Sequence, residues 1–165
     1  MTCSAWGAEG DYGGAPLHAA ANSGQLKVIA RLLKAGDDVD LLSRPGETPL
    51  FFAIREKKGQ PAVAALIKAG ASVNVKNKTG VTPLMTAVME GRVEAAKLLV
   101  SKGADTSVVT KKRTMISDSK DTMQTVEVGS SLMAIAKLMK LPKLVAVLPK
   151  DAGTTHRSVN KQPGR

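Results

Sequence analysis

The stretch Thr82-Pro83-Leu84-Met85-Thr86-Ala87 decides the fold, because the chain contains three versions of it. The earlier versions read Ala15-Pro16-Leu17-His18-Ala19-Ala20 and Thr48-Pro49-Leu50-Phe51-Phe52-Ala53. The leucines of successive boxes lie 33 and 34 residues apart. A box of six residues that recurs at an almost constant distance indicates an internal repeat.

Each box is followed by further landmarks in a fixed order. Apolar residues recur at helical spacing about nine residues on, and then Gly36, Gly70 or Gly103 ends the pattern. The proline after the first box residue suits the first turn of a helix, where its missing N–H is not needed. Each repeat is therefore predicted to hold two short helices and a glycine-containing turn.

This pattern resembles the ankyrin family, whose repeats of about 33 residues carry a T-P-L-H-x-A-like box. The resemblance implies an all-α solenoid in which two antiparallel helices and a projecting β-turn finger form each repeat. Counting from the anchors predicts about four repeats, the last degenerate and preceded by an extended finger insertion. The predicted repeats span about 10–42, 43–76, 77–108 and 130–148, with the insertion at 109–129.

The remaining boundaries and two local features follow from composition. Residues 1–9 are expected to be a lead-in and 149–165 a flexible basic tail, which leaves 10–148 as the ankyrin-repeat domain. The insertion contains two β-prone runs and is predicted to form a hairpin, with a disordered loop as the alternative. Thr48 is predicted to cap its helix through its hydroxyl. One extra residue lies between the two helices of the second repeat.

The formal net charge of +10 is unevenly distributed along the chain. Residues 1–42 carry −2, 43–108 carry +5, 109–129 carry +1 and 130–165 carry +6. An acidic protein surface, RNA or anionic lipid would be attracted to the C-terminal half. The single cysteine, Cys3, permits no internal disulfide, so we expect an intracellular, reducing compartment: first the cytoplasm, with an organelle as the alternative. No secretory signal pattern is visible, and no apolar run reaches the ~18 residues that span a bilayer.

No combination of residues predicts catalysis, a cofactor or a metal site. His18 occupies the histidine position of the box and is interpreted as structural, because neither a nucleophile nor a carboxylate recurs with it. With only two histidines and one cysteine, no metal-ligand cluster forms at a usable spacing. The chain is therefore predicted not to be an enzyme.

What remains as a candidate site is the surface. The resemblance implies that a partner protein binds at the finger tips and on the exposed side of the first helices. The predicted protein-binding residues are Asp11, Tyr12, Asn22, Ser23, Arg44, Pro45, Glu47, Arg55, Glu56, Lys78, Thr79, Val81, Met89 and Glu90. The predicted basic anchoring residues are Lys111, Lys112, Arg113, Lys137, Lys140, Lys143, Lys150, Arg157, Lys161 and Arg165.

Three functions fit these surfaces. The first is an adaptor or scaffold that binds a partner protein without catalysis. The second is an accessory subunit of a large assembly, including a ribonucleoprotein, anchored to RNA or an acidic neighbour by the basic insertion and tail. The third is an enzyme inhibitor, by similarity to small ankyrin proteins that inhibit cyclin-dependent kinases. Among these the sequence favours the adaptor.

Overall fold

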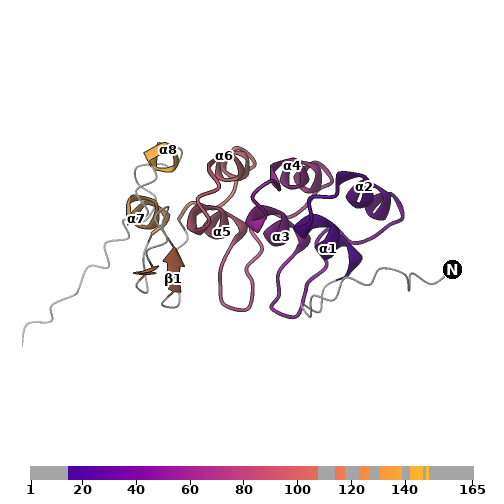
Figure 1. Cartoon of the computed structure of the whole chain (residues 1–165), viewed down its shortest axis with the longest axis horizontal. Helices are drawn as coiled ribbons and strands as arrows, with labels where there is room; N and C mark the ends of the chain where they lie inside the picture. Colours follow the sequence, from indigo (N-terminus) through magenta and orange to yellow (C-terminus); the bar gives the residue numbers. More distant parts are fainter. Residues whose placement is uncertain are drawn as a thin grey trace, which may run out of the picture.

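The computed structural model shows two rows of short helices (Figure 1). It describes residues 15–107, 114–117, 123–126, 131–138, 142–146 and 148. The first helices of the repeats form one row and the second helices the other. The first row consists of α1 (Pro16–Asn22), α3 (Pro49–Arg55), α5 (Pro83–Met89) and α7 (Leu132–Leu138). The second row consists of α2 (Leu26–Lys34), α4 (Gln60–Lys68), α6 (Val93–Ser101) and α8 (Pro142–Val145).

The box leucines form one continuous core through the first row. Leu17, Leu50, Leu84 and Leu132 are each at most 1% exposed. Their helices pack in sequence, α1 on α3, α3 on α5 and α5 on α7. A helix of seven residues buries too little apolar surface to be stable alone, so each repeat depends on its neighbours. The predicted solenoid of stacked helix pairs is therefore confirmed.

The fourth helix pair packs like the others despite its altered box. Helix α7 contacts α5, and α8 contacts both α7 and α6. Helix α8 begins at Pro142, where a first-turn proline is tolerated. Leu132 and Ala136 are fully buried, so this pair continues the core past the third repeat.

Two fingers project from the side of the first helices (Figure 1). The second finger is the segment between α2 and α3, and the third finger is the segment between α4 and α5, each named after the repeat whose first helix follows it. Neighbouring fingers are joined at their bases, where the Asp40 carboxylate accepts hydrogen bonds from the N–H (2.9 Å) and the hydroxyl (2.5 Å) of Ser72. They are joined again at their tips, where the N–H of Lys78 donates to the carbonyl of Pro45 (3.0 Å). The two fingers therefore lie side by side in register.

The predicted insertion contains a pair of short strands. Strand β1 (Thr114–Ser117) runs antiparallel to β2 (Met123–Val126). Thr114 lies opposite Val126, and Ser117 lies opposite Met123. This pairing agrees with the predicted hairpin and not with a disordered loop. The predicted lead-in at 1–9 and the tail at 149–165 lie outside the residues that the structure describes.

Thr48 is the N-cap residue of α3, as predicted, but the predicted hydrogen bond from its hydroxyl group is wrong. The Phe51 N–H, which a capping hydroxyl would bind, donates instead to the backbone carbonyl of Thr48 (3.0 Å). The Thr48 hydroxyl is buried and has no hydrogen-bond partner within the described part of the chain. The equivalent Thr82 does cap its helix, because its hydroxyl accepts from the Met85 N–H (3.2 Å). Two identical residues at equivalent positions thus make different bonds.

Candidate protein-binding surface

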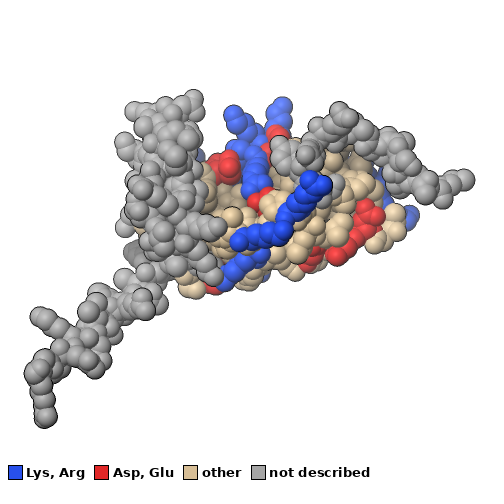
Figure 2. Space-filling view, turned by 90° about the horizontal axis from the view of Figure 1, so that it is seen from below, with Lys and Arg blue, Asp and Glu red and all other residues tan. Residues whose placement is uncertain are grey.

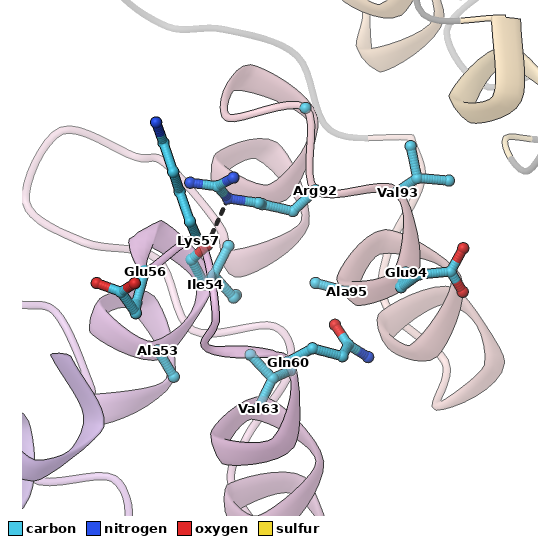
Figure 3. Close-up of a pocket in the computed structure, with 11 residues that line it drawn as sticks. Ala53, Ile54, Glu56, Lys57, Gln60, Val63, Arg92, Val93, Glu94 and Ala95 are labelled. Carbon is cyan, nitrogen blue, oxygen red and sulfur yellow. Dashed lines mark hydrogen bonds between the residues drawn. The ribbon is translucent and has the colours of Figure 1, made fainter. Parts of the chain in front are cut away.

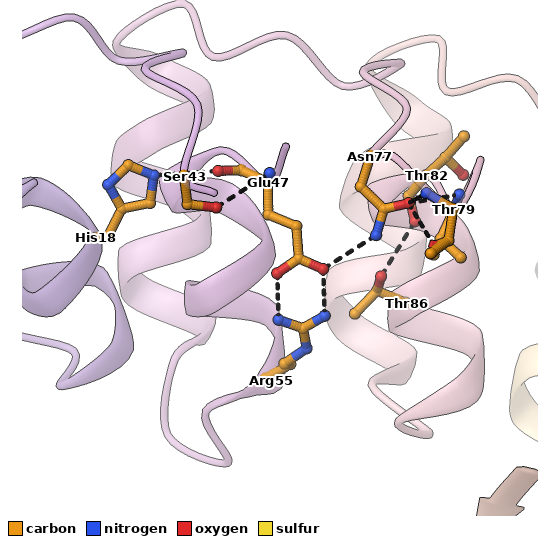
Figure 4. Close-up of polar contacts among 9 residues, drawn as sticks. His18, Ser43, Glu47, Arg55, Asn77, Thr79, Thr82 and Thr86 are labelled. Atoms are coloured by element: carbon orange, nitrogen blue, oxygen red, sulfur yellow. Dashed lines mark hydrogen bonds and ion pairs between the residues drawn. The ribbon is translucent and has the colours of Figure 1, made fainter. Parts of the chain in front are cut away.

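A half-buried ion pair lies where the second finger meets the first row of helices (Figure 4). The two Glu47 carboxylate oxygens lie 2.6 Å from Nη1 and Nη2 of Arg55, which is a bidentate pair. The Asn77 side-chain amide, from the next finger, donates to Glu47 Oε1 (3.0 Å). Such charge-assisted bonds are stronger than neutral ones and fix the orientation of both groups. The cluster therefore connects the second repeat to the third.

His18 connects the same cluster to the first repeat. Its Nδ1 accepts a hydrogen bond from the Ala15 N–H (3.1 Å), so the proton is assigned to Nε2. Nε2 then donates to the backbone carbonyl of Glu47 (3.1 Å). The ring also packs edge-on against Phe52, with centroids 5.2 Å apart. Both ring nitrogens are thus used in structural bonds, as predicted for this histidine.

Asn77 organises the turn of the third finger. Its side-chain oxygen accepts from the N–H of Thr79 (3.0 Å), the hydroxyl of Thr79 (2.7 Å) and the N–H of Val81 (2.9 Å). This is the local bonding by which asparagine stabilises turns. The amide nitrogen of Asn77 is bound to Glu47, so both polar atoms of its side chain make hydrogen bonds within the protein.

The environment of Glu47 keeps its carboxyl group ionised. Burial alone would raise the pKa, but hydrogen bonding with Arg55, the charge of Arg55 and the hydrogen bond from Asn77 outweigh it. The pKa of Glu47 is therefore lowered below its ordinary value of 4.5. At neutral pH the cluster holds one carboxylate and one guanidinium, and the two charges cancel within it.

Glu47 requires a correction, because we expected it among the exposed contact residues of the finger. The residue is only 5% exposed and points inward to Arg55. Leaving a carboxylate at this depth without a partner would be costly, so the ion pair explains its burial. Glu47 is a structural residue and is excluded from the contact surface below.

Most other predicted contact residues lie at the surface. Those classed as exposed are Asn22, Ser23, Arg44, Pro45, Arg55, Lys78, Thr79 and Glu90, while Glu56, Val81 and Met89 are half-buried. Asp11 and Tyr12 lie outside the residues that the structure describes. They therefore stay predictions.

Only a small part of the predicted basic anchoring set can be placed. Lys143 is exposed on α8, and Lys137 belongs to α7. The rest lie outside the described ranges: Lys111, Lys112, Arg113, Lys140, Lys150, Arg157, Lys161 and Arg165. Anchoring through these residues stays a prediction.

Two exposed leucines of the second finger, Leu41 and Leu42, were not among the predicted contact residues. Leu41 is 41% exposed and Leu42 is 57% exposed, and both lie in the second finger. A signal was available in the repeat pattern, because the equivalent positions of the next finger hold Val75 and Lys76. An apolar residue where the neighbouring repeat has lysine indicates a contact surface more than a core position.

A shallow hollow of about 240 Å³ lies between the turn that joins α3 to α4 and the turn that joins α5 to α6 (Figure 3). Ile54, Val63 and Ala95 contribute apolar groups to it. The polar lining residues are Glu56, Lys57, Gln60, Arg92 and Glu94. No histidine, cysteine or serine lines this hollow.

Comparison with known families agrees with this geometry. A family model of ankyrin repeats, in three copies, matches residues 8–110. The chain belongs to the ankyrin-repeat family. Ankyrin repeats are protein-binding modules and are generally non-catalytic. The match ends before α7, so the fourth helix pair of this ankyrin-repeat protein is supported by the spacing of the sequence and by its packing, and not by the family match. A search of curated proteins found no match.

Two further findings apply to the described residues of this ankyrin-repeat protein. No group of three or more His, Cys, Asp or Glu side chains there could hold a metal ion. Within the same residues, every helix is too short or too polar to cross a lipid bilayer.

Proposed function

We propose that the chain is a non-catalytic adaptor or scaffold that binds a partner protein through its finger tips and the exposed side of the first helices. The surface consists of the ends of α1, α3 and α5 and the tips of the two fingers. It is assembled from three repeats that are bonded to one another through the Glu47 cluster. A partner would therefore meet a preformed surface.

The observation that carries this proposal is the position of Arg55. Its side chain is 40% exposed, yet Glu47 holds the guanidinium by two hydrogen bonds. The guanidinium carbon also lies 6.0 Å from the centre of the Phe52 ring. An arginine held in place loses less side-chain entropy on binding, and arginines are enriched among residues that dominate interface energies. Arg55 thus has the properties of an interface anchor.

The test uses the neighbouring residues Met89 and Glu90, because removing Arg55 would leave Glu47 without its ion pair. Partners captured by the full chain are identified, and one is purified for calorimetric titration. We expect Met89→Glu and Glu90→Lys each to weaken its binding about tenfold or more. Matched controls on the second helices, Lys68→Glu and Lys97→Glu, should bind like the parent chain. If only the two control variants lost binding, the partner would bind on the second helices, which contradicts the proposed contact surface.

A further inference from the structure

We propose that Leu42, Arg44, Lys76 and Lys78, here called the finger edge, bind an extended acidic segment of the partner protein that also carries apolar residues. This inference rests on the proposed function and specifies the chemistry of the partner. The finger edge joins two neighbouring fingers, so its residues come from segments more than 30 residues apart in the sequence.

The geometry holds the two basic finger tips together. Besides the bond from Lys78 N–H to the Pro45 carbonyl, the stem of Lys78 lies against Gly46. A Cβ atom built on Gly46 would be 3.2 Å from both Cγ and the backbone nitrogen of Lys78. Gly46 also has a φ of 78°, which few other residues adopt readily. The absence of a side chain at Gly46 therefore allows Lys78 to lie close beside the tip that carries Arg44.

The charge of this region is positive. Arg44, Lys76 and Lys78 are all exposed. Of the acids in the second finger, Glu47 is turned inward and neutralised by Arg55, and the Asp40 carboxylate at the base of the finger is bound to Ser72. Seen from below, Lys and Arg side chains lie across the middle of the face (Figure 2). Such a surface attracts an acidic partner and increases its rate of association.

An acidic residue near Lys76, Asp105, reduces the positive charge at that end of the finger edge. Hydrogen bonds from Ser107, and more weakly the charge of Lys76, lower the pKa of the exposed Asp105. Asp105 is thus ionised at neutral pH and offsets part of the charge of Lys76. We therefore expect Lys78 to contribute more to binding than Lys76.

Leu42 adds an apolar contact to this basic surface. It lies between Asp40 and Pro45, the two residues through which the second finger bonds to Ser72 and Lys78 of the third. Leu42 is therefore beside the segment that contains Lys76. At 57% exposure it is the most exposed large apolar side chain in the described part of the chain. A segment that is both acidic and apolar complements this combination better than a purely acidic one.

RNA fits the same surface less well. Proteins that bind single-stranded nucleic acid combine basic residues with exposed aromatic rings that stack on bases. The described aromatic residues of the chain, Phe51 and Phe52, are 0% and 6% exposed. An exposed leucine has no hydrogen-bonding or stacking role toward bases. The finger edge therefore favours a protein segment.

The experiment measures binding of the full chain to a fluorescein-labelled peptide of three Glu-Glu-Leu-Glu units by fluorescence anisotropy. The double variant Lys76→Glu/Lys78→Glu should bind about tenfold or more weakly, because attraction becomes repulsion. The matched control, Lys27→Glu/Lys34→Glu, makes the same charge change at two exposed lysines of α2. We expect its affinity to fall less than about threefold, since screened long-range attraction is all that it loses.

A second arm tests the apolar contact. Leu42→Ser should weaken binding of the leucine-containing peptide several-fold and leave binding of a Glu-Glu-Ser-Glu peptide unchanged. Circular dichroism melting confirms that each variant is folded. The proposal would be overturned if the parent chain did not bind the peptide, if Lys76→Glu/Lys78→Glu bound it as well as the parent chain, or if the two lysine pairs lost equal affinity. It would also be overturned if Leu42→Ser affected both peptides equally. Displacement of the peptide by a lower concentration of poly-uridine RNA than of unlabelled peptide would also overturn it.

The two proposals can fail separately. If the captured partner binds normally to Lys76→Glu/Lys78→Glu but not to Met89→Glu, the acidic-segment inference fails and the adaptor proposal stands. If Met89→Glu and Glu90→Lys bind the partner like the parent chain, the proposed contact surface on the first helices is wrong, and with it the adaptor proposal.

Discussion

Arg92 of the third repeat donates a hydrogen bond to the backbone carbonyl of Ile54 (3.3 Å; Figure 3) and another to that of Arg55 (2.7 Å), both at the end of helix α3. This helix leads into the turn that contains the extra residue, and the chain leaves it in an extended conformation at Glu56. The last carbonyls of a helix have no partner within it. A side chain from the next repeat therefore completes the end of α3.

Arg92→Ala is expected to lower the free energy of unfolding by about 1–2 kcal/mol, because two backbone carbonyls lose their partner. Arg92→Lys should recover part of this, since an ammonium group can reach one carbonyl. Urea denaturation measures both effects. Lys102→Ala, at an exposed lysine after α6, is the control and should change stability by less than about 0.5 kcal/mol. A similar loss in the control would show that the carbonyl contacts contribute nothing specific.

Gly59→Ala should be strongly destabilising for a reason unrelated to backbone conformation. The φ of Gly59 is −75°, which alanine adopts freely, but a Cβ there would lie 1.9 Å from the carbonyl oxygen of Ala53. We expect a loss of about 2–3 kcal/mol in urea denaturation, because a backbone atom cannot move aside cheaply.

Gly36→Ala is the comparison for this effect. Gly36 has a φ of 97° and no atom within 4 Å of an added Cβ, so only conformational strain applies. That strain should cost about 1–2 kcal/mol. If Gly59→Ala were less damaging than Gly36→Ala, the close contact with Ala53 would not be a real constraint.

Thr48→Val is expected to leave stability unchanged or raise it by up to about 1 kcal/mol, since it removes a buried hydroxyl that lacks a partner. Thr82→Val, at the equivalent position, should instead cost about 1 kcal/mol because it removes a cap. Thermal denaturation of the two variants side by side gives the comparison. Equal destabilisation by both would mean that the Thr48 hydroxyl is satisfied in solution.

Glu47→Gln is expected to lower the free energy of unfolding by about 1–3 kcal/mol at pH 7, because Arg55 loses its charged partner. The pKa of Glu47 is lower in the folded chain than its ordinary value of 4.5, so its contribution is present above that value. The contribution is lost as the pH falls through the folded pKa. The difference between parent and variant should therefore shrink as the pH falls below 4.5. A difference that stayed constant from pH 7 to pH 3 would contradict this interpretation.

The sequence alone determined the architecture. The box leucines, the prolines that begin the helices and the glycines that end the repeats recur at a constant distance, and each of these features acts locally. Because a repeat can bury its apolar side only against another repeat, the recurrence of Leu17, Leu50 and Leu84 also implied the stack. The fourth helix pair was also predicted from the sequence, by measuring along the chain from Gly103 to Leu132.

Only the tertiary structure decided which polar residues face outward. The positions equivalent to Glu47 in the neighbouring repeats are Gly14 and Val81, so no recurring pattern indicated an inward carboxylate. Its partners Arg55 and Asn77 lie 8 and 30 residues further along the chain, and only stacking brings them together. The same is true of Lys78, which reaches Gly46 across two fingers. Pairing between repeats depends on three-dimensional distance, which the spacing of residues in one repeat does not contain.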